Sequence, residues 1–136
     1  GKQTLGRLIA GLTTPATRYL QALNFRRQIL DQFVESVFQK ADVLHIPVMI
    51  TPVPTLAEPN LAANPGFSTF IAAMGHCTRP INYLGLPALS VPCGFTKSGL
   101  PTSFQLVGRP FDESTLYRLG RAYERETDWT EYAPEL

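Results

Sequence analysis

Two side chains of the nucleophile type, Ser90 and Cys93, lie three residues apart in the uncharged stretch NYLGLPALSVPCGF. A nucleophile for acyl transfer needs a base that activates it and hydrogen-bond donors for the oxyanion. Ser90 lies in ALSVP, which is neither a Gly-x-Ser-x-Gly elbow nor a Ser-x-x-Lys pair. We therefore interpret Ser90 as a structural hydroxyl. A Cys93 thiolate activated by His45 or His76 is an alternative, but the pattern favours a small thiol buried in a core strand.

Residues that bind metals or phosphates are few. The chain has two His and two Cys, and His76 and Cys77 are adjacent, so these two side chains rarely point at one ion. No Gly-rich phosphate loop is present, and the acidic pair Asp112 and Glu113 suits the start of a helix. The sequence therefore predicts no metal site and no cofactor.

Arg26 is the most informative charged residue because it falls inside an apolar stripe, three residues after Leu23 and four before Leu30. A charge on a buried stripe is costly unless it is paired. Either the stem packs while the head reaches solvent or an acid, or the guanidinium points into a cleft and holds a carboxylate or carbonyl. The pattern alone favours the first interpretation. Arg79, at the start of a short helix, is similarly open between binding and plain surface exposure.

Periodicity predicts the elements that must position these residues. Apolar residues at helical spacing, with Thr14 as N-cap and Pro15 at the first helical position, predict a long helix over residues 15–40. The other predicted elements are strands over 43–50, 88–95 and 102–108, a loop over 51–66, helices from Phe67 and over 78–85, and a C-terminal helix over 112–127 with Leu116, Leu119 and Tyr123 buried.

These elements predict an α/β fold with a mixed β-sheet flanked by helices. The first two strands, joined through helices, suit a parallel pairing, and a hairpin turn at Lys97-Ser98-Gly99 adds an antiparallel one. Three strands make a small sheet for so much apolar sequence, which indicates that the sheet is part of a larger one.

Composition bounds the class of protein. The 136 residues form one unit the size of a single domain. A net charge of +1 without a basic block predicts no nucleic-acid surface, and no apolar run reaches the length of a membrane span. Two cysteines make no disulfide framework, so a reducing, cytoplasmic setting is expected.

Several motifs in a fixed order resemble one family. NYLGLPALSVPCGF is followed by GLP, FQLVGRPFDE and a helix with AYE, and it is preceded by YLQALNFRRQILDQFVESVFQKADVLHIP. From about Tyr19 to Pro134, the chain resembles the C-terminal part of the amidase signature hydrolases. The resemblance implies the amidase signature fold and, for the whole enzyme, hydrolysis of the carbon–nitrogen bond of a small-molecule amide.

The resemblance also implies what is missing. Enzymes of this family use a nucleophilic Ser, a bridging Ser on a cis peptide and a Lys base, all from the earlier two-thirds of the family chain. The Gly/Ser-rich signature is absent here, and Lys2, Lys40 and Lys97 lack the context of the base. The resemblance therefore implies the last third of an amidase, without catalytic residues, inactive by itself and completed by the remainder of the domain.

Three substrate-binding candidates carry over from the family. In members that hold a carboxylate-bearing substrate, an Arg on the long helix, four residues after an Ala, approaches that carboxylate, and Ala22 and Arg26 match this spacing. The helical segment just before the Asn-x-x-Gly-x-Pro block lines the family's substrate pocket. Thr78 and Arg79 fall in that segment, with Gly75 one turn earlier.

Two departures from the family pattern keep other functions open. Ile46 stands where the family commonly has Thr, and Thr102-Ser103 replace the usual Val-Gly, which adds two hydroxyls beside Gln105. The alternatives are a non-catalytic binding or scaffold protein and part of the amidase subunit of a tRNA-dependent amidotransferase. Because a sheet cut from its neighbours exposes an edge and apolar surface, we also predict that the chain alone self-associates.

Overall fold

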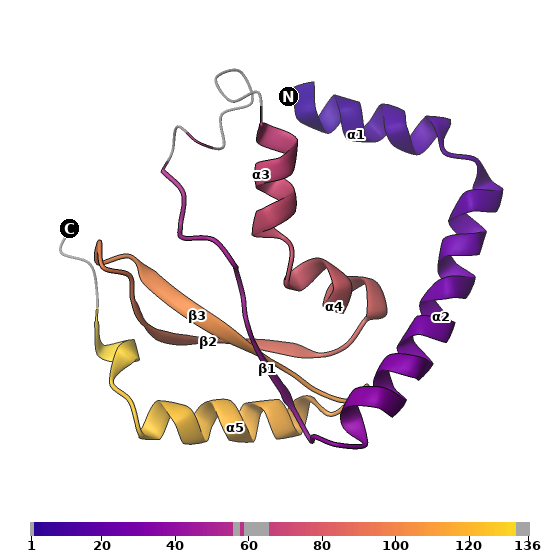
Figure 1. Cartoon of the computed structure of the whole chain (residues 1–136). Coiled ribbons are helices and arrows are strands. Elements are labelled where there is room, and N and C mark those ends of the chain that lie inside the picture. The colour runs from indigo at the N-terminus through magenta and orange to yellow at the C-terminus, as the bar shows by residue number, and fades with distance from the viewer. Residues whose placement is uncertain (1, 56–57, 59–65, 133–136) are drawn as a thin grey trace.

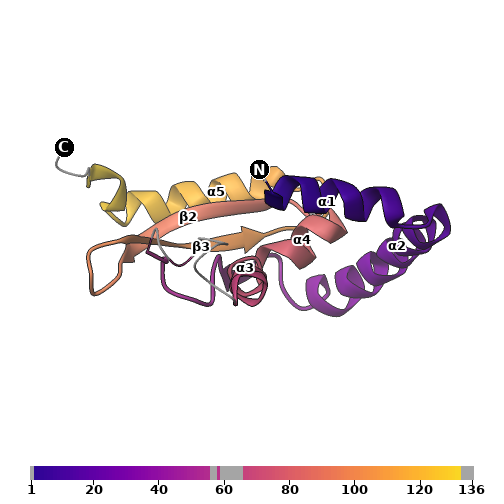
Figure 2. The same ribbon diagram turned by 90° about the horizontal axis from the view of Figure 1, so that it is seen from above.

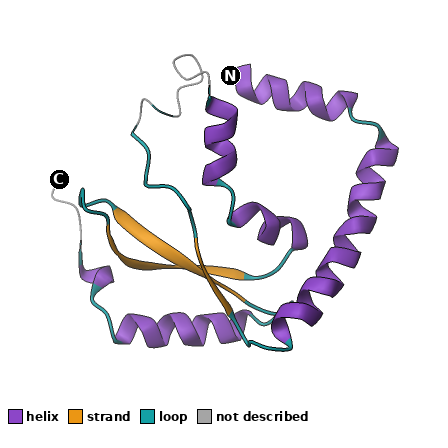
Figure 3. Cartoon of the chain, viewed as in Figure 1, coloured by secondary structure: helices purple, strands orange, loops and turns teal. Residues whose placement is uncertain are grey.

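The computed structural model describes residues 2–55, 58 and 66–132, and its helices surround a small sheet (Figure 1). Figure 3 shows the same chain by secondary structure. The elements are α1 (Lys2–Thr13), α2 (Ala16–Phe38), β1 (Leu44–Pro47), α3 (Phe67–Met74), α4 (Thr78–Leu84), β2 (Ala88–Phe95), β3 (Pro101–Val107), α5 (Glu113–Arg125) and a 3-10 turn at Trp129–Glu131. Within the loop predicted over 51–66, residues 56–57 and 59–65 lie outside the described part, as does the end of the resemblance at Pro134.

The sheet corrects one prediction. Among the described residues its strand order is β1-β3-β2, and both neighbouring pairs are antiparallel. The predicted parallel pairing of the first two strands is wrong, because β3 lies between them. The connection from β1 to β2 through α3 and α4 is long enough to pass over one strand position, and the tight hairpin after β2 places β3 beside it. The α/β class is confirmed, whereas both ladders of the described sheet are antiparallel rather than mixed.

Helices cover both faces of the sheet, as Figure 2 shows from above. On one face, α2 and α4 bury a cluster around Phe38 and Val107, which are 2% and 0% exposed. On the other face, α5 inserts Leu116 against Val91 and Phe104. Alternation along β3 explains this division, since successive residues of a strand point to opposite faces.

The long helix packs along only part of its length. Leu30, Phe33 and Val37 contact the core, whereas Tyr19 and Leu23, on the same predicted stripe, are 62% and 41% exposed. Within the described residues, the N-terminal half of α2 therefore carries an apolar stripe without a covering layer.

Two details at helix starts and faces also differ from the prediction. The N-cap of α2 is Pro15, and the Thr14 hydroxyl instead donates to the carbonyl of Ala10.

On α5, Leu116 and Gly120 are buried, while Leu119 is 43% exposed. The buried face of α5 contains Leu116 and the residue four positions later, Gly120, rather than the residue three positions later, Leu119. Because Gly120 has no side chain, the helix lies close to Leu89 at this point.

No described helix is both long enough and apolar enough to cross a membrane.

Candidate functional site

Arg26 lies where α2 crosses the C-terminal end of α4. Its Nη2 donates a hydrogen bond to the carbonyl oxygen of Leu84 at 3.3 Å. Gly85, which ends α4 with φ 73°, leaves the space for this guanidinium, because a Cβ there would clash with Nη2. The negative end of the α4 dipole favours a cation at this point. Tyr83 adds a second link between the helices through a hydrogen bond from its hydroxyl to the Ala22 carbonyl.

The Arg26 guanidinium keeps unused hydrogen-bonding capacity. Its Nε is buried without a hydrogen-bond partner among the described residues, and neither of the ion pairs found there involves it. An arginine head has five N–H donors in a planar fork, so the donors that Leu84 leaves unused remain free for an acceptor. A carboxylate or carbonyl oxygen is the chemistry that fits such a group.

Thr78 and Arg79 lie at the opposite, N-terminal end of α4. Thr78 is half-buried, whereas Arg79 is exposed and folds back over α3, with Nη2 donating to the carbonyl of Ile71 at 2.9 Å. Gly75 makes room for this side chain, since a Cβ there would lie 2.7 Å from Nε. Thr78 and Arg79 thus lie at the start of α4, and Arg26 of α2 contacts its end. No described hydrogen bond joins Arg26 to the other two.

The two candidate nucleophiles, Ser90 and Cys93, lie on strand β2. Ser90 is exposed on β2, and the Cys93 sulfur lies 3.6 Å from the Thr102 hydroxyl. The ring of His45 packs against Phe104 at a centroid distance of 4.4 Å. In the described ranges, no hydrogen bond links Ser90 or Cys93 to a histidine, and no three His, Cys, Asp or Glu side chains gather as a metal site.

Gln105 is a residue that the sequence reasoning left without a role. It lies on the central strand β3, is 4% exposed, and is the one buried polar side chain among the described residues. Its Nε2 donates to the carbonyl of Pro47 at 3.2 Å and to that of Cys77 at 3.3 Å. The signal was an amide side chain between apolar neighbours, Phe104 and Leu106, in the predicted strand TSFQLVG.

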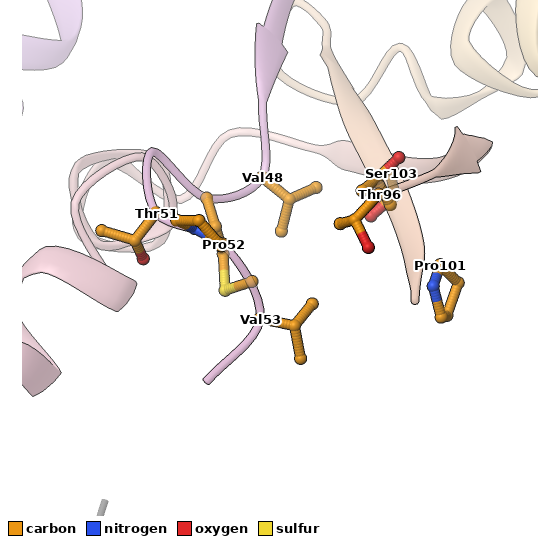
Figure 4. Close-up of a pocket in the computed structure, with 9 residues that line it drawn as sticks. Val48, Thr51, Pro52, Val53, Thr96, Pro101 and Ser103 are labelled. Atoms are coloured by element: carbon orange, nitrogen blue, oxygen red, sulfur yellow. The ribbon is translucent and has the colours of Figure 1, made fainter. Parts of the chain in front are cut away.

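An open pocket of about 100 Å³ lies where the β2–β3 hairpin meets the loop after β1 (Figure 4). Thr102 and Ser103, which replace the Val-Gly of the family pattern, contribute to its lining together with Val48, Thr51 and Val53. The Thr51 hydroxyl oxygen is buried without a partner in the described part of the chain.

One carboxyl in the same loop has a shifted pKa. Hydrogen bonds from the Thr55 backbone N–H and then from the Thr55 hydroxyl lower the pKa of Glu58 below its ordinary value. Both bonds favour the ionised carboxylate. The two bonds join residues three positions apart in the sequence.

Comparisons with known proteins give a family match and several relatives. A family model described as Amidase matches residues 3–117. The A subunit of glutamyl-tRNA(Gln) amidotransferase from Chloroflexus aggregans is 38% identical over 141 residues, which cover 100% of this chain and 28% of that protein. The corresponding protein of Myxococcus xanthus is 46% identical over 111 residues, covering 82% and 22%.

Solved structures lead to the same fold. A crystal structure of an amidase matches with a TM-score of 0.79 and 25% identity, over 94% of this chain and 29% of that chain. A structure from work on a vestigial protein complex and the evolutionary origins of an s-triazine catabolic enzyme matches with a TM-score of 0.72 and 26% identity, over 91% and 27%. The chain thus spans less than a third of the length of these proteins.

Proposed function

This chain belongs to the amidase family, and on that basis we propose that it is the C-terminal part of a larger amide hydrolase. In this role it completes the β-sheet and supplies one wall of the substrate pocket, while the catalytic Ser, Ser and Lys come from the remainder of the domain. The observation that carries the proposal is the family match along most of a chain that spans only 28% of its relative. The two free cysteines accord with a reducing, cytoplasmic setting.

An activity assay tests this division of labour. We expect the 136-residue chain alone to leave a simple amide intact, and we expect hydrolysis once the amidase-signature portion of a relative is supplied. The reason is that, among the described residues, no hydrogen bond joins a Ser or Cys side chain to a His or Lys that could activate it as a nucleophile. Hydrolysis by the isolated chain would overturn the proposal.

The proposed pocket wall consists of Arg26, Thr78 and Arg79. Arg26 is supported by its unused donors and by the absence of an acid partner within the described residues. A guanidinium held in place by Leu84 loses little further freedom when it binds, so it suits a fixed carboxylate on the substrate. Thr78 and Arg79 rest on the family resemblance and on their position at the start of the same helix.

Substitution of Arg26 in the complete enzyme tests its role. Arg26→Ala should raise KM about tenfold or more for an amide that carries a carboxylate, because a charge-assisted hydrogen bond is lost. The KM for an amide without a carboxylate should change by less than about threefold. Arg27→Ala, one residue away and exposed, is the matched control and should leave both values unchanged. Equal losses on both substrates would assign Arg26 to structure alone.

Two alternatives have their own tests. The names of the relatives favour a parent that is the A subunit of a glutamyl-tRNA(Gln) amidotransferase. Conversion of glutamyl-tRNA(Gln) by the complete protein together with its partner subunits would select that parent over a stand-alone amidase. A non-catalytic scaffold is the second alternative, and a coding sequence that starts shortly before Gly1 without an amidase signature upstream would favour it.

A further inference from the structure

Gln105 stands out because a primary amide is buried in the middle of the sheet. It is 4% exposed and lies on β3, paired in register with Ile46 of β1 and Ser90 of β2. Burying an amide costs free energy unless its donors and acceptors are bonded. A buried amide at this point therefore needs hydrogen-bond partners, and the bonds of its nitrogen Nε2 show which residues these are.

The two hydrogens of Nε2 go to two different segments. One bond reaches the carbonyl of Pro47, the last residue of β1, at 3.2 Å, and the other reaches the carbonyl of Cys77 at 3.3 Å. Cys77 is the residue immediately before α4. One side chain of the central strand thus ties the end of an edge strand to the turn between α3 and α4.

The other end of α4 is tied in the same manner. Arg26 donates to the carbonyl of Leu84 at the last residue of the helix. A helix of seven residues is too short to be stable by its own hydrogen bonds. Its position therefore depends on packing and on side-chain hydrogen bonds at both ends. Gln105 binds the N-terminal end, and near the C-terminal end Arg26 binds Leu84 and Tyr83 binds Ala22.

We infer that Gln105 is a positioning residue that fixes the N-terminal end of α4, and with it Thr78 and Arg79, against the sheet. The inference rests on the proposed function in so far as it makes these two residues part of the substrate pocket. A glutamine is specifically suited, because neither a carboxylate nor an apolar side chain has a hydrogen to donate to the carbonyls of Pro47 and Cys77.

The experiment combines hydrogen exchange with kinetics in the complete protein that carries this chain. In Gln105→Glu and in Gln105→Met, amide exchange over residues 77–84 should become about tenfold faster than in the wild type. Exchange over α5, which packs on the opposite face of the sheet, should stay unchanged. Gln28→Glu makes the same chemical change at an exposed position of α2 and should alter neither segment.

Kinetics then separate positioning from general damage. Both Gln105 variants should raise KM for the amide substrate about fivefold while kcat stays within about twofold, because the wall moves and the catalytic groups do not. Unchanged exchange over residues 77–84, or equal acceleration over α5, would overturn the positioning role. Faster amide exchange over residues 77–84 with an unchanged KM would mean that Gln105 stabilises the structure but does not position the substrate pocket, which would overturn its role in binding. An inactive wild type would contradict the proposed function instead, and the exchange result would still decide the role of Gln105.

Discussion

At the scale of single residues, Arg26 and Gly85 form a complementary pair. The glycine adopts a positive φ that ends α4, and its missing side chain is the space that the guanidinium fills. The position of the Arg26 guanidinium therefore depends on the missing side chain at residue 85 as well as on the carbonyl of Leu84. This dependence gives a prediction with an internal control, since Gly99 has nearly the same φ but an open surrounding.

Gly85→Ala should destabilise the chain more than Gly99→Ala. Each substitution forces a side chain into the left-handed region, at a cost of about 1–2 kcal/mol. Gly85→Ala should add about 1 kcal/mol or more, because the new Cβ displaces Arg26 from the Leu84 carbonyl. Urea unfolding at low protein concentration measures both free energies. Equal destabilisation by the two variants would mean that Arg26 does not occupy this space.

At the scale of elements, α5 shows which face of an amphipathic helix is buried against the sheet. Leu116 is 2% exposed between the helix and the sheet, while Leu119, one turn away on the same helix, is 43% exposed. Gly120 takes the inward position that the helical periodicity assigned to Leu119, and a Cβ there would lie 2.6 Å from the Leu89 side chain, so that side chain would have to move.

Leu116→Ala and Leu119→Ala make the same chemical change at the two positions. Leu116→Ala should lower the free energy of unfolding by about 2–5 kcal/mol, the range for a leucine truncated in a packed core. Leu119→Ala should lower it by less than about 1 kcal/mol. Thermal or urea unfolding of the two variants measures the difference. Similar losses would show that Leu119 is also packed, against a surface beyond the described residues.

At the scale of the whole molecule, the exposed area is too large for a compact monomer. The chain exposes 10348 Å², whereas a compact protein of 15.0 kDa exposes roughly 7,000 Å². Apolar side chains of α1 and of the first half of α2 contribute, among them Leu8, Leu12 and Leu20 at 62%, 87% and 57%. Such a surface favours association with further protein, which agrees with the proposed role as part of a larger amide hydrolase.

The isolated chain should therefore self-associate, and a charge on the apolar arm should reduce that association. Light scattering after size-exclusion chromatography should show species larger than a monomer for the wild type and a smaller share of them for Leu12→Glu. Thr4→Glu adds the same charge to a polar position of α1 and serves as control. A wild-type chain that stays monomeric at high concentration, without binding a dye for apolar surface, would contradict this prediction.

Local information was sufficient for the elements and the family. Helical spacing located the long helix over residues 15–40, observed at Ala16–Phe38, and alternation located the strand observed at Ala88–Phe95. The motif order identified the amidase relationship, which the family match confirms. Each helix, strand and single motif depends on residues within a few positions of one another, where propensity and periodicity act. The family relationship needed only the order of these motifs along the chain, not their contacts in space.

Only the tertiary structure decided how distant segments meet. The order β1-β3-β2 pairs a strand with one that comes much later in the chain. The bond of Arg26 to Leu84 and the bonds of Gln105 to Pro47 and Cys77 join residues 28 to 58 positions apart. No local pattern encodes such a contact, because it depends on how the whole chain fills the space between sheet and helices. The sequence by itself determined the family and the absence of its serine signature, and the fold decided that a guanidinium and an amide hold the two ends of α4.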